Sequence, residues 1–438
     1  MFKRVMIFFI LSLQAVASSD GIASSCVQIK TSLNNQRIPW AQQVHNKAQH
    51  KPTKNDFNIM WSGAEHLQLG DLGFQKACEK NSVQNESFCL LNGIYRNDRK
   101  IAFSYGELLA LGDFYLKVDD AYFENSRKHS IGEIFQCIDK EGRVHAEQKS
   151  NPELKYPDCT WVNVLYGGDY LSVVMKNYDH FAWDNVKAYV KHHERALFYA
   201  QAAGRSYRSG RTELALKILN KALFINAFAD HYLTDSFPAG HLRVPRKDLK
   251  DWAKDNTSRL LGSFIGDGLG MLMHDYEGKD EYGNEVGLVV QNSLGVKWRT
   301  GSDTHLNTCA TEEDAKIAMP LSAVELSVNE VLKAFLYDEV PESAFEALWY
   351  VPYPDNRGLL KKWQDILDMQ NSNRIIEDMR SSLPLPVRLI LKKKYIRRMI
   401  QQLPKIMDRF EDRIAEELRQ SPQLRRRIPG LFQQSLTH

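Results

Sequence analysis

The sequence lacks several features that would define its class at once. Beyond its first 17 residues it has no run of about 18 apolar residues, which a membrane-spanning helix needs. It has no Cys-x-x-Cys pair and no internal repeat of about 20–50 residues, which argues against a zinc ribbon and a repeat protein. The charge has no dominant sign, since 57 basic residues stand against 54 acidic ones among 438. The composition is therefore that of a large globular chain, and we expect no transmembrane segment.

The first residues have the pattern of a secretory signal peptide. Two basic residues, Lys3 and Arg4, precede the apolar run 5–13, and small residues up to Ala17 follow it. This order of a basic, an apolar and a small-residue segment is typical of a signal that is removed on export. We therefore expect residues 1–17 to be a signal peptide and the protein to be secreted, to the periplasm or the outside of the cell.

The cysteine content fits an exported protein. Six cysteines in such a chain predict disulfide bonds rather than a metal site. The pairs favoured by proximity, followed by the two cysteines left to pair or to stay free, are Cys78 with Cys89, Cys137 with Cys159, and then Cys26 and Cys309.

Composition divides the mature chain into three regions. Residues 18–57 are polar and have little periodicity, which is typical of an N-terminal arm. Residues 58–340 are expected to form a helical catalytic domain that binds metal. Within it, the stretch 124–160 is rich in charge, glycine and proline, and we expect an inserted excursion with a small hairpin. Residues 341–438 predict a basic helical C-terminal region.

Helical periodicity dominates the central region. Apolar residues recur at i, i+3 and i+4 in the segments 104–115, 186–207 and 212–234. The last of these segments is apolar nearly all round, so we expect a buried helix. The fold class that follows is all-α, a multi-helix bundle.

The near-neutral charge conceals a division along the chain. Residues 384–438 contain 13 basic and 5 acidic residues, a net charge of +8, so the rest of the chain carries +3 − 8 = −5. A basic amphipathic tail can bind an anionic membrane surface. It can equally contact a secretion apparatus or pack on the protein's own acidic body, and the sequence leaves these three interpretations open.

The strongest chemical signal is a run of spaced metal-binding residues. His231 and Asp235 are four positions apart on the predicted buried helix, so their side chains project from one face. Pro238 and Gly240 then end the helix and turn the chain, which can return His241 to the same place. Buried polar groups need partners, and imidazole with carboxylate is a donor set that zinc prefers. The pattern therefore predicts a metal site.

A second cluster lies upstream of this run. Asp179 precedes a helix and His193 follows fourteen positions later inside it. His180 is an alternative to Asp179, and His192 is an alternative to His193. Because neighbouring helix positions point about 100° apart, we expect only one of the two adjacent histidines to face the site.

With these residues, the chain resembles the zinc-dependent phospholipase C / S1–P1 nuclease superfamily, which consists of all-helical enzymes with a trinuclear zinc cluster. The resemblance covers about residues 60–310 and rests chiefly on the run 229–243, which looks most like the phospholipases C of Gram-negative secretors. It implies a bundle of that type. It also implies that Asp235 bridges two metals, and that Asp179 binds metal and orients or deprotonates the attacking water.

The sequence departs from the superfamily at the last metal ligand. A histidine with an acidic residue four positions later is expected, and His274 is the candidate histidine, but position 278 is glycine. Asp275, Glu277 and Asp303 are the alternatives for the missing carboxylate. We take His274 and Asp275 as the predicted ligands and leave the other two open.

The superfamily also uses a tryptophan at the mature N-terminus together with a nearby histidine. Trp61 and His66 have the five-residue spacing found in the nuclease branch. Signal cleavage after Ala17 would leave Trp61 internal, so either a propeptide is removed or the third metal site is built differently. His66 is in both cases a predicted ligand.

The predicted function is that of a secreted phospholipase C that depends on two or three Zn²⁺ ions. Its substrates would be glycerophospholipids such as phosphatidylcholine at a membrane surface, cleaved to diacylglycerol and a phosphorylated headgroup. Asp179 and Asp235 are the expected catalytic residues. Two alternatives remain. One is a nuclease that adds aromatic stacking for a base, although the favoured interpretation has no nucleic-acid partner. The other is a non-catalytic effector that binds lipid or a host protein.

Overall fold

The computed structural model describes most of the chain from residue 63 onward. The described ranges are 63–81, 93–95, 97, 102–123, 131–147, 151, 173, 176–279, 286–303, 305–306, 313–338, 345–353, 356–383 and 385–421. The predicted signal peptide, the N-terminal arm and Trp61 therefore lie outside the described residues.

Two cysteines lie within the described part. Cys78 and Cys137 are both disulfide-bonded, which agrees with the prediction that the cysteines form disulfide bonds. The partners proposed for them, together with Cys26 and Cys309, lie outside the described residues, so the pairing itself stays a prediction.

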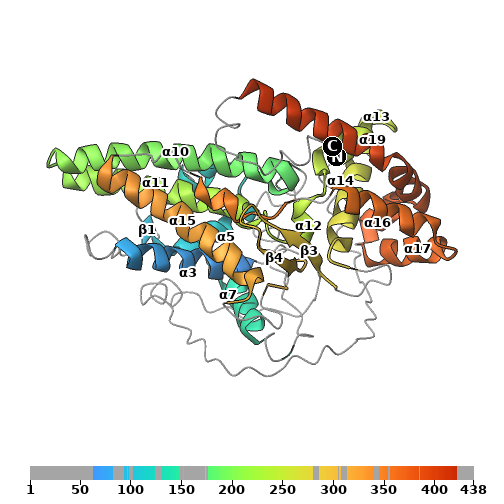
Figure 1. The fold of residues 1–438 in the computed structure, drawn as a ribbon, viewed down its shortest axis with the longest axis horizontal. Helices are drawn as coiled ribbons and strands as arrows, with labels where there is room; N and C mark the ends of the chain where they lie inside the picture. Colours follow the sequence, from blue (N-terminus) through green and yellow to red (C-terminus); the bar gives the residue numbers. More distant parts are fainter. Residues whose placement is uncertain are drawn as a thin grey trace.

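The described part is mostly helical, as expected for an all-α protein. Four long helices lie alongside one another (Figure 1), namely α3 (Gly63–Asn81), α10 (Ala182–Arg208), α11 (Thr212–Thr234) and α15 (Ala315–Tyr337). The helix α11 begins and ends where its apolar pattern predicts, and from Ala222 to Thr234 every residue is buried. The prediction that this segment forms a buried helix is confirmed.

The segment 104–115 forms two shorter elements instead of one helix. The helix α5 (Tyr105–Ala110) starts at a capping box made by Ser104 and Glu107, and η1 (Leu111–Phe114) continues it as a tighter turn. This change in winding matters because η1 carries Asp113 toward the end of α11, where the metal-binding run lies.

The predicted excursion contains a helix. Residues 131–147 form α7 (Ile131–Glu147), so the expectation of a hairpin is wrong for this part of 124–160. The helix packs on α3, where Glu141 accepts a hydrogen bond of 3.2 Å from the backbone nitrogen of Ala64. Burial of its apolar face against α3 outweighs the turn-forming residues at its flanks.

The remaining elements complete the C-terminal half and the connections. Two antiparallel hairpins occur in the described part, formed by short strands. The elements are β1 (Ile94–Tyr95), β2 (Ala102–Phe103), α6 (Val118–Phe123), η2 (Tyr178–His180), α12 (Ala239–Leu242), α13 (Arg246–Asp255), α14 (Arg259–Tyr276), β3 (Leu288–Gln291), β4 (Lys297–Thr300), η3 (Glu346–Trp349), α16 (Asn356–Asp368), α17 (Ser372–Ser382), α18 (Leu385–Ile390) and α19 (Lys393–Gln420).

The basic C-terminal helices pack on the body of the protein. The helices α13, α14, α16, α17 and α19 contact one another and gather at one end of the molecule (Figure 1). Arg413 of α19 pairs with Asp184 at 2.9 Å and with Asp248 at 2.8 Å, and Arg409 pairs with Asp255 at 3.0 Å. These contacts favour the interpretation that the tail binds the protein's own acidic groups.

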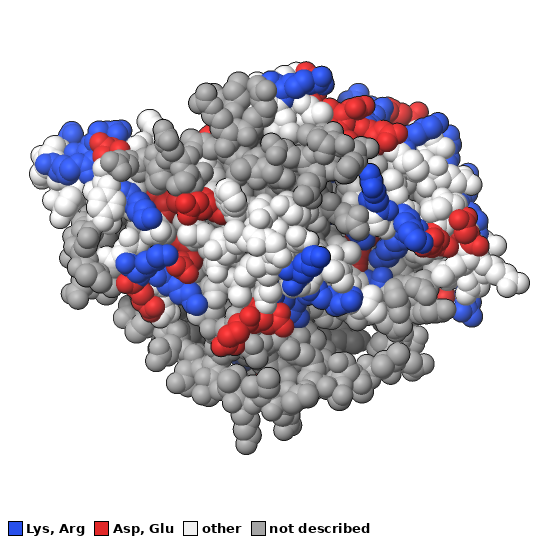
Figure 2. All heavy atoms as spheres, viewed as in Figure 1, with Lys and Arg blue, Asp and Glu red and all other residues white. Residues whose placement is uncertain are grey.

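The surface is mixed in charge. On the face shown in Figure 2, lysine and arginine side chains lie among aspartate and glutamate side chains. Within the described residues, no helix combines the length and the apolar character that a membrane crossing requires. Ion pairs between α19 and acidic residues of the body therefore offset part of the division of charge along the sequence.

Replacing Arg413 with alanine is expected to destabilise the fold. Its side chain is only 15% exposed and bridges Asp184 of α10 and Asp248 of α13. The change leaves the buried Asp248 without this cation, while Asp184 keeps only its contact with Lys187 at 3.2 Å. Breaking such a pair costs about 3 kcal/mol of unfolding free energy. Urea unfolding measures it, with Arg419→Ala as the control, because Arg419 is 70% exposed in a pair with Glu416. Equal unfolding free energies for the two variants would contradict this stabilising role of Arg413.

Candidate metal centre

Three groups of histidine and aspartate side chains converge at the end of α11. In each group the possible ligand atoms lie within 4.8 Å of one another and all the residues are buried. The groups are His66 with His231 and Asp235, then Asp113 with His180 and His231, then His241 with His274 and Asp303. The first two groups share His231, so they form one continuous cluster.

Asp235 is the centre of this cluster. It caps the C-terminus of α11, one turn after His231, and its carboxylate is 3.3 Å from the Nε2 atom of that histidine. The same carboxylate lies 2.9 Å from His180 and 3.4 Å from His66. His241, which α12 returns to the site after Pro238, is 3.6 Å away. The structure brings together the three residues of the run, as their spacing predicts. It also places His66 and His180 there, so that one carboxylate faces four imidazoles.

Asp113 was not singled out by sequence reasoning, and His180 was only the alternative to Asp179. The Nδ1 atom of His180 is 3.0 Å from His231 Nε2, and Asp113 Oδ1 is 3.6 Å from that same nitrogen. Asp179 lies on the outer side of His180, with its carboxylate 3.9 Å from Nε2 and its side chain 43% exposed. The structure thus brings His180 into the cluster and leaves Asp179 at its edge.

The third group shows which of the three alternative carboxylates lies between His241 and His274. Asp303 Oδ2 is 3.0 Å from His274 Nε2 and 3.3 Å from His241 Nε2, so it lies between the two histidines. Asp275 instead contacts the opposite nitrogen of His274, Nδ1, at 3.0 Å. Glu277 pairs with Arg243. Of the three alternatives, Asp303 is therefore the one placed to share a metal with His241 and His274.

His193 lies in a different buried network. Its Nδ1 atom bonds to Asn226 at 2.6 Å and its Nε2 atom to Glu330 at 2.8 Å, so both ring nitrogens are occupied. Its neighbour His192 stacks on Tyr232. The expectation that one of these adjacent histidines joins the metal cluster is not met in the structure, since α10 turns both of them toward other partners.

The residues fit a metal ion in spacing and in support. In a tetrahedral zinc site, bonds of about 2.0–2.1 Å place neighbouring ligand atoms about 3.3 Å apart, and the distances from the Asp235 carboxylate to nitrogens of His66, His180 and His231 range from 2.9 to 3.4 Å. The outer nitrogen of His66 bonds to Thr234 at 2.8 Å and that of His241 to the carbonyl of His180 at 2.7 Å. Such outer contacts hold metal-binding imidazoles in place.

A buried atom in the cluster also needs a partner. Asp113 Oδ1 has no hydrogen-bond donor among the described residues, although the side chain is almost fully buried. A buried carboxylate oxygen without a donor costs free energy, and a cation in the cluster would compensate it. This observation and the donor set together favour a divalent metal.

Without a metal ion, the negative charge of the carboxylates in the cluster is balanced by protons on the neighbouring histidines. Burial alone would lower the pKa of His66, but the hydrogen bond to Asp235 and its charge raise it to about 9. Burial likewise opposes the charged form of His274, yet Asp303 and Asp275 raise its pKa to about 10. Burial raises the pKa of Asp113 to about 6. At neutral pH both histidines therefore carry a proton that a metal must displace.

Metal binding at pH 7.5 is expected to release protons and to tighten as the pH rises. The protonated form of each histidine competes with metal, so affinity increases until the pH passes the raised pKa values of about 9 and 10. Titration calorimetry with Zn²⁺ in two buffers of different ionisation enthalpy gives the number of protons released. Identical heats in the two buffers would contradict this assignment of charge.

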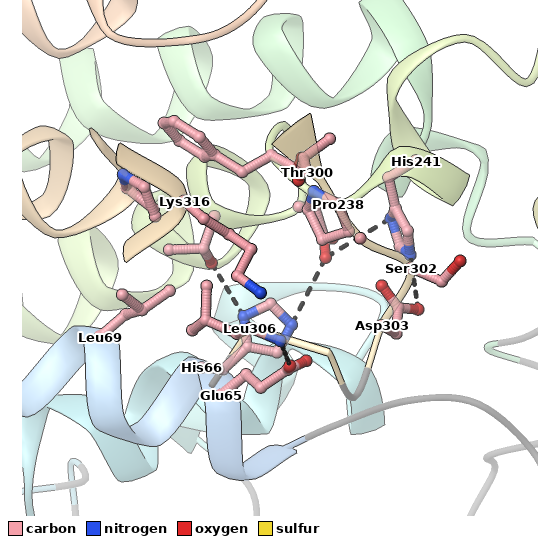
Figure 3. Close-up of a pocket in the computed structure, with 15 residues that line it drawn as sticks. Glu65, His66, Leu69, Pro238, His241, Thr300, Ser302, Asp303, Leu306 and Lys316 are labelled. Atoms are coloured by element: carbon pink, nitrogen blue, oxygen red, sulfur yellow. Dashed lines mark hydrogen bonds and ion pairs between the residues drawn. The ribbon is translucent and has the colours of Figure 1, made fainter. Parts of the chain in front are cut away.

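A pocket opens beside the cluster (Figure 3). Its empty space, counting the part open to solvent, is about 540 Å³. His66, Asp235, His241 and Asp303 belong to the polar part of the wall, and Figure 3 shows His241 and Asp303 together on one side with His66 on the other. The apolar part of the wall consists of Leu69, Phe237, Pro238, Leu306 and Pro320. The pocket therefore suits a molecule with one polar end, which would lie against a metal ion in the cluster, and one apolar end, which would lie against these apolar side chains.

Asp113 and Asp235 face the same nitrogen of His231, which can bind one metal ion, so the first two groups could share one ion and the third group could hold another next to the open pocket. Such an arrangement suits the activation of water for hydrolysis. Compared with protein-family models, curated proteins and solved structures, the chain matches none of them.

Proposed function

We propose that this chain is a secreted, zinc-dependent phosphodiester hydrolase that acts as a phospholipase C. The observation that carries the proposal is the cluster centred on Asp235, in which four imidazoles surround one carboxylate beside an open pocket. The resemblance of the run 229–243 to phospholipases C supports the choice of substrate. The fold proposed with it is the helical bundle of that superfamily.

The side chains of the candidate site would form two sets of metal ligands. One set of side chains would hold metal at the end of α11, namely His66, Asp113, His180, His231 and Asp235. A second set would hold it on the other side of Asp235, namely His241, His274 and Asp303. When bound, zinc ions neutralise charge on the phosphate and lower the pKa of water toward neutrality. Asp235 would lie between these two sets of ligands and hold them at a fixed distance from each other.

The carboxylates just outside the cluster would orient the imidazoles. Asp275 reaches Nδ1 of His274 at 3.0 Å and would keep that ring turned toward Asp303. The carboxylate of Asp179 is 3.9 Å from Nε2 of His180, beyond hydrogen-bond distance, so it would act on that ring through its charge. The catalytic role of Asp179 expected from the sequence stays a prediction, and its position at the edge of the cluster favours an orienting role.

The apolar part of the pocket supports a lipid substrate. Leu69, Phe237 and Leu306 offer a surface for the glycerol backbone and the first carbons of an acyl chain, beside the polar cluster that would take the phosphate. The leaving group would then depart as diacylglycerol into the membrane.

Hydrolysis of headgroup-labelled phosphatidylcholine tests the proposal. We expect metal-replete protein to release phosphocholine, a chelator to stop the release and added zinc to restore it. A His231→Ala variant should be inactive, because His231 belongs to two of the three ligand groups. No release from metal-replete protein would reject the phospholipase, and hydrolysis of single-stranded DNA instead would support the nuclease alternative.

A further inference from the structure

A lysine lies in the wall of the same pocket. Lys316 is in the first turn of α15, two residues after the cap Asp314, whose side chain accepts a hydrogen bond from the backbone nitrogen of Lys316. It lines the pocket with His66, Asp235 and Asp303. Figure 3 shows its side chain extending toward His66 and Leu306.

The position of Lys316 is fixed by the loop that also carries Asp303. The ammonium group donates a hydrogen bond of 2.9 Å to the backbone carbonyl of His305. The next residue, Leu306, donates its backbone N–H to Glu65 at 2.8 Å. His305 is thus tied to α15 and Leu306 to α3, and the ammonium group is held at the pocket wall beside the predicted ligands.

A fixed cation beside a site for divalent metals has an electrostatic cost. Like charges repel strongly where water is partly excluded, and an anion that contacts both of them removes the repulsion. A substrate phosphate has more than one non-bridging oxygen, so one of them can bind metal while another binds an ammonium group. The pocket therefore suits a ligand whose phosphate lies between the cluster and Lys316.

We propose that Lys316 is a further catalytic residue, which binds a non-bridging oxygen of the substrate phosphate and stabilises the charge that develops there during hydrolysis. This inference rests on the proposed function. In the reaction, water forms the new bond to phosphorus while the bond to the glyceryl oxygen breaks. One proton of the water ends on that leaving oxygen and the other stays with the phosphomonoester or is released. Lys316 keeps its own protons throughout and contributes only charge.

Binding of inorganic phosphate to the zinc-loaded protein tests the site without turnover. We expect Lys316→Met to bind phosphate at least about tenfold more weakly by titration calorimetry, with zinc content unchanged, and Lys316→Arg to recover part of the affinity. The matched control is Lys333→Met, because Lys333 is exposed on the same helix. Equal phosphate affinity in wild type and Lys316→Met at equal zinc content would overturn the proposal.

Turnover separates this inference from the function on which it rests. On phosphatidylcholine vesicles and on a water-soluble phosphodiester, Lys316→Met should lower kcat by about 10²–10³-fold, the effect of removing one fixed donor to a developing charge. An unchanged kcat on both substrates would overturn the catalytic role. If wild type hydrolyses neither substrate and phosphate binding still depends on Lys316, the proposed function fails while the anion site stands.

Discussion

Replacing Asp113 with asparagine is expected to lower metal affinity and turnover, whereas the same change at Asp179 leaves metal content close to that of the wild type. Asp113 is almost fully buried, and its Oδ1 atom faces the shared ligand His231 at 3.6 Å. Asparagine keeps the shape but removes the negative charge, so one ligand group loses its only carboxylate. Asp179 is 43% exposed and its nearest contact with the cluster is 3.9 Å.

The two variants are distinguished by zinc content and by kcat measured together. For Asp113→Asn we expect turnover to fall by at least about 100-fold, and zinc to be lost on dialysis against a weak chelator. For Asp179→Asn the fall should be within about tenfold, the lower end for a residue that only orients a ligand. The opposite order would mean that Asp179 is the ligand, as the spacing in the sequence indicated.

The part of the site carried by one helix and one turn could be predicted from the sequence. His231 and Asp235 are four positions apart, and α-helical geometry alone places such side chains on one face. Pro238 and Gly240 require the chain to turn before His241, and the structure has the short helix α12 there. Local geometry, which depends only on nearby residues, was sufficient for these three side chains.

The ligands contributed by distant segments could not be predicted in the same way. Asp113 belongs to a tight turn after α5, and no periodic pattern marks an aspartate in such a turn as buried. The fourteen-residue spacing between Asp179 and His193 indicated a pair, but His193 lies three turns inside α10 and is held by Asn226 and Glu330. Tertiary packing of α10 against α11 and α15 decides which histidine reaches the cluster.

Charge along the chain also needed the fold for its interpretation. The sequence places a net charge of +8 in residues 384–438, which is consistent with a membrane, a partner or the protein's own body as its target. Ion pairs between α19 and two other helices, through Arg413, show how part of this charge is neutralised internally. A sum over residues contains no information about which charges face each other.

Replacing Gly112 with alanine is expected to damage the metal centre although Gly112 offers no ligand. A Cβ atom at this position would lie 2.2 Å from Cγ and 2.4 Å from Cδ2 of the His231 ring. These distances are far shorter than a van der Waals contact, so either the ring or the turn η1 must move. His231 is fully buried on the well-packed helix α11, so the turn is the part that can yield.

The consequence reaches two ligands, because Asp113 is the next residue in that turn. Forced repacking of a buried contact costs about 1–3 kcal/mol, and displaced ligands typically weaken metal binding by about 10–100-fold. Urea unfolding of metal-free protein measures the first effect, and zinc titration measures the second. Gly142→Ala is the control: nothing lies within 4 Å of its added Cβ, and it lies within α7, where alanine should stabilise by about 0.5–1 kcal/mol. If Gly112→Ala kept full zinc affinity, Asp113 and His231 could not belong to one rigid ligand group, because the substitution separates them by steric force alone.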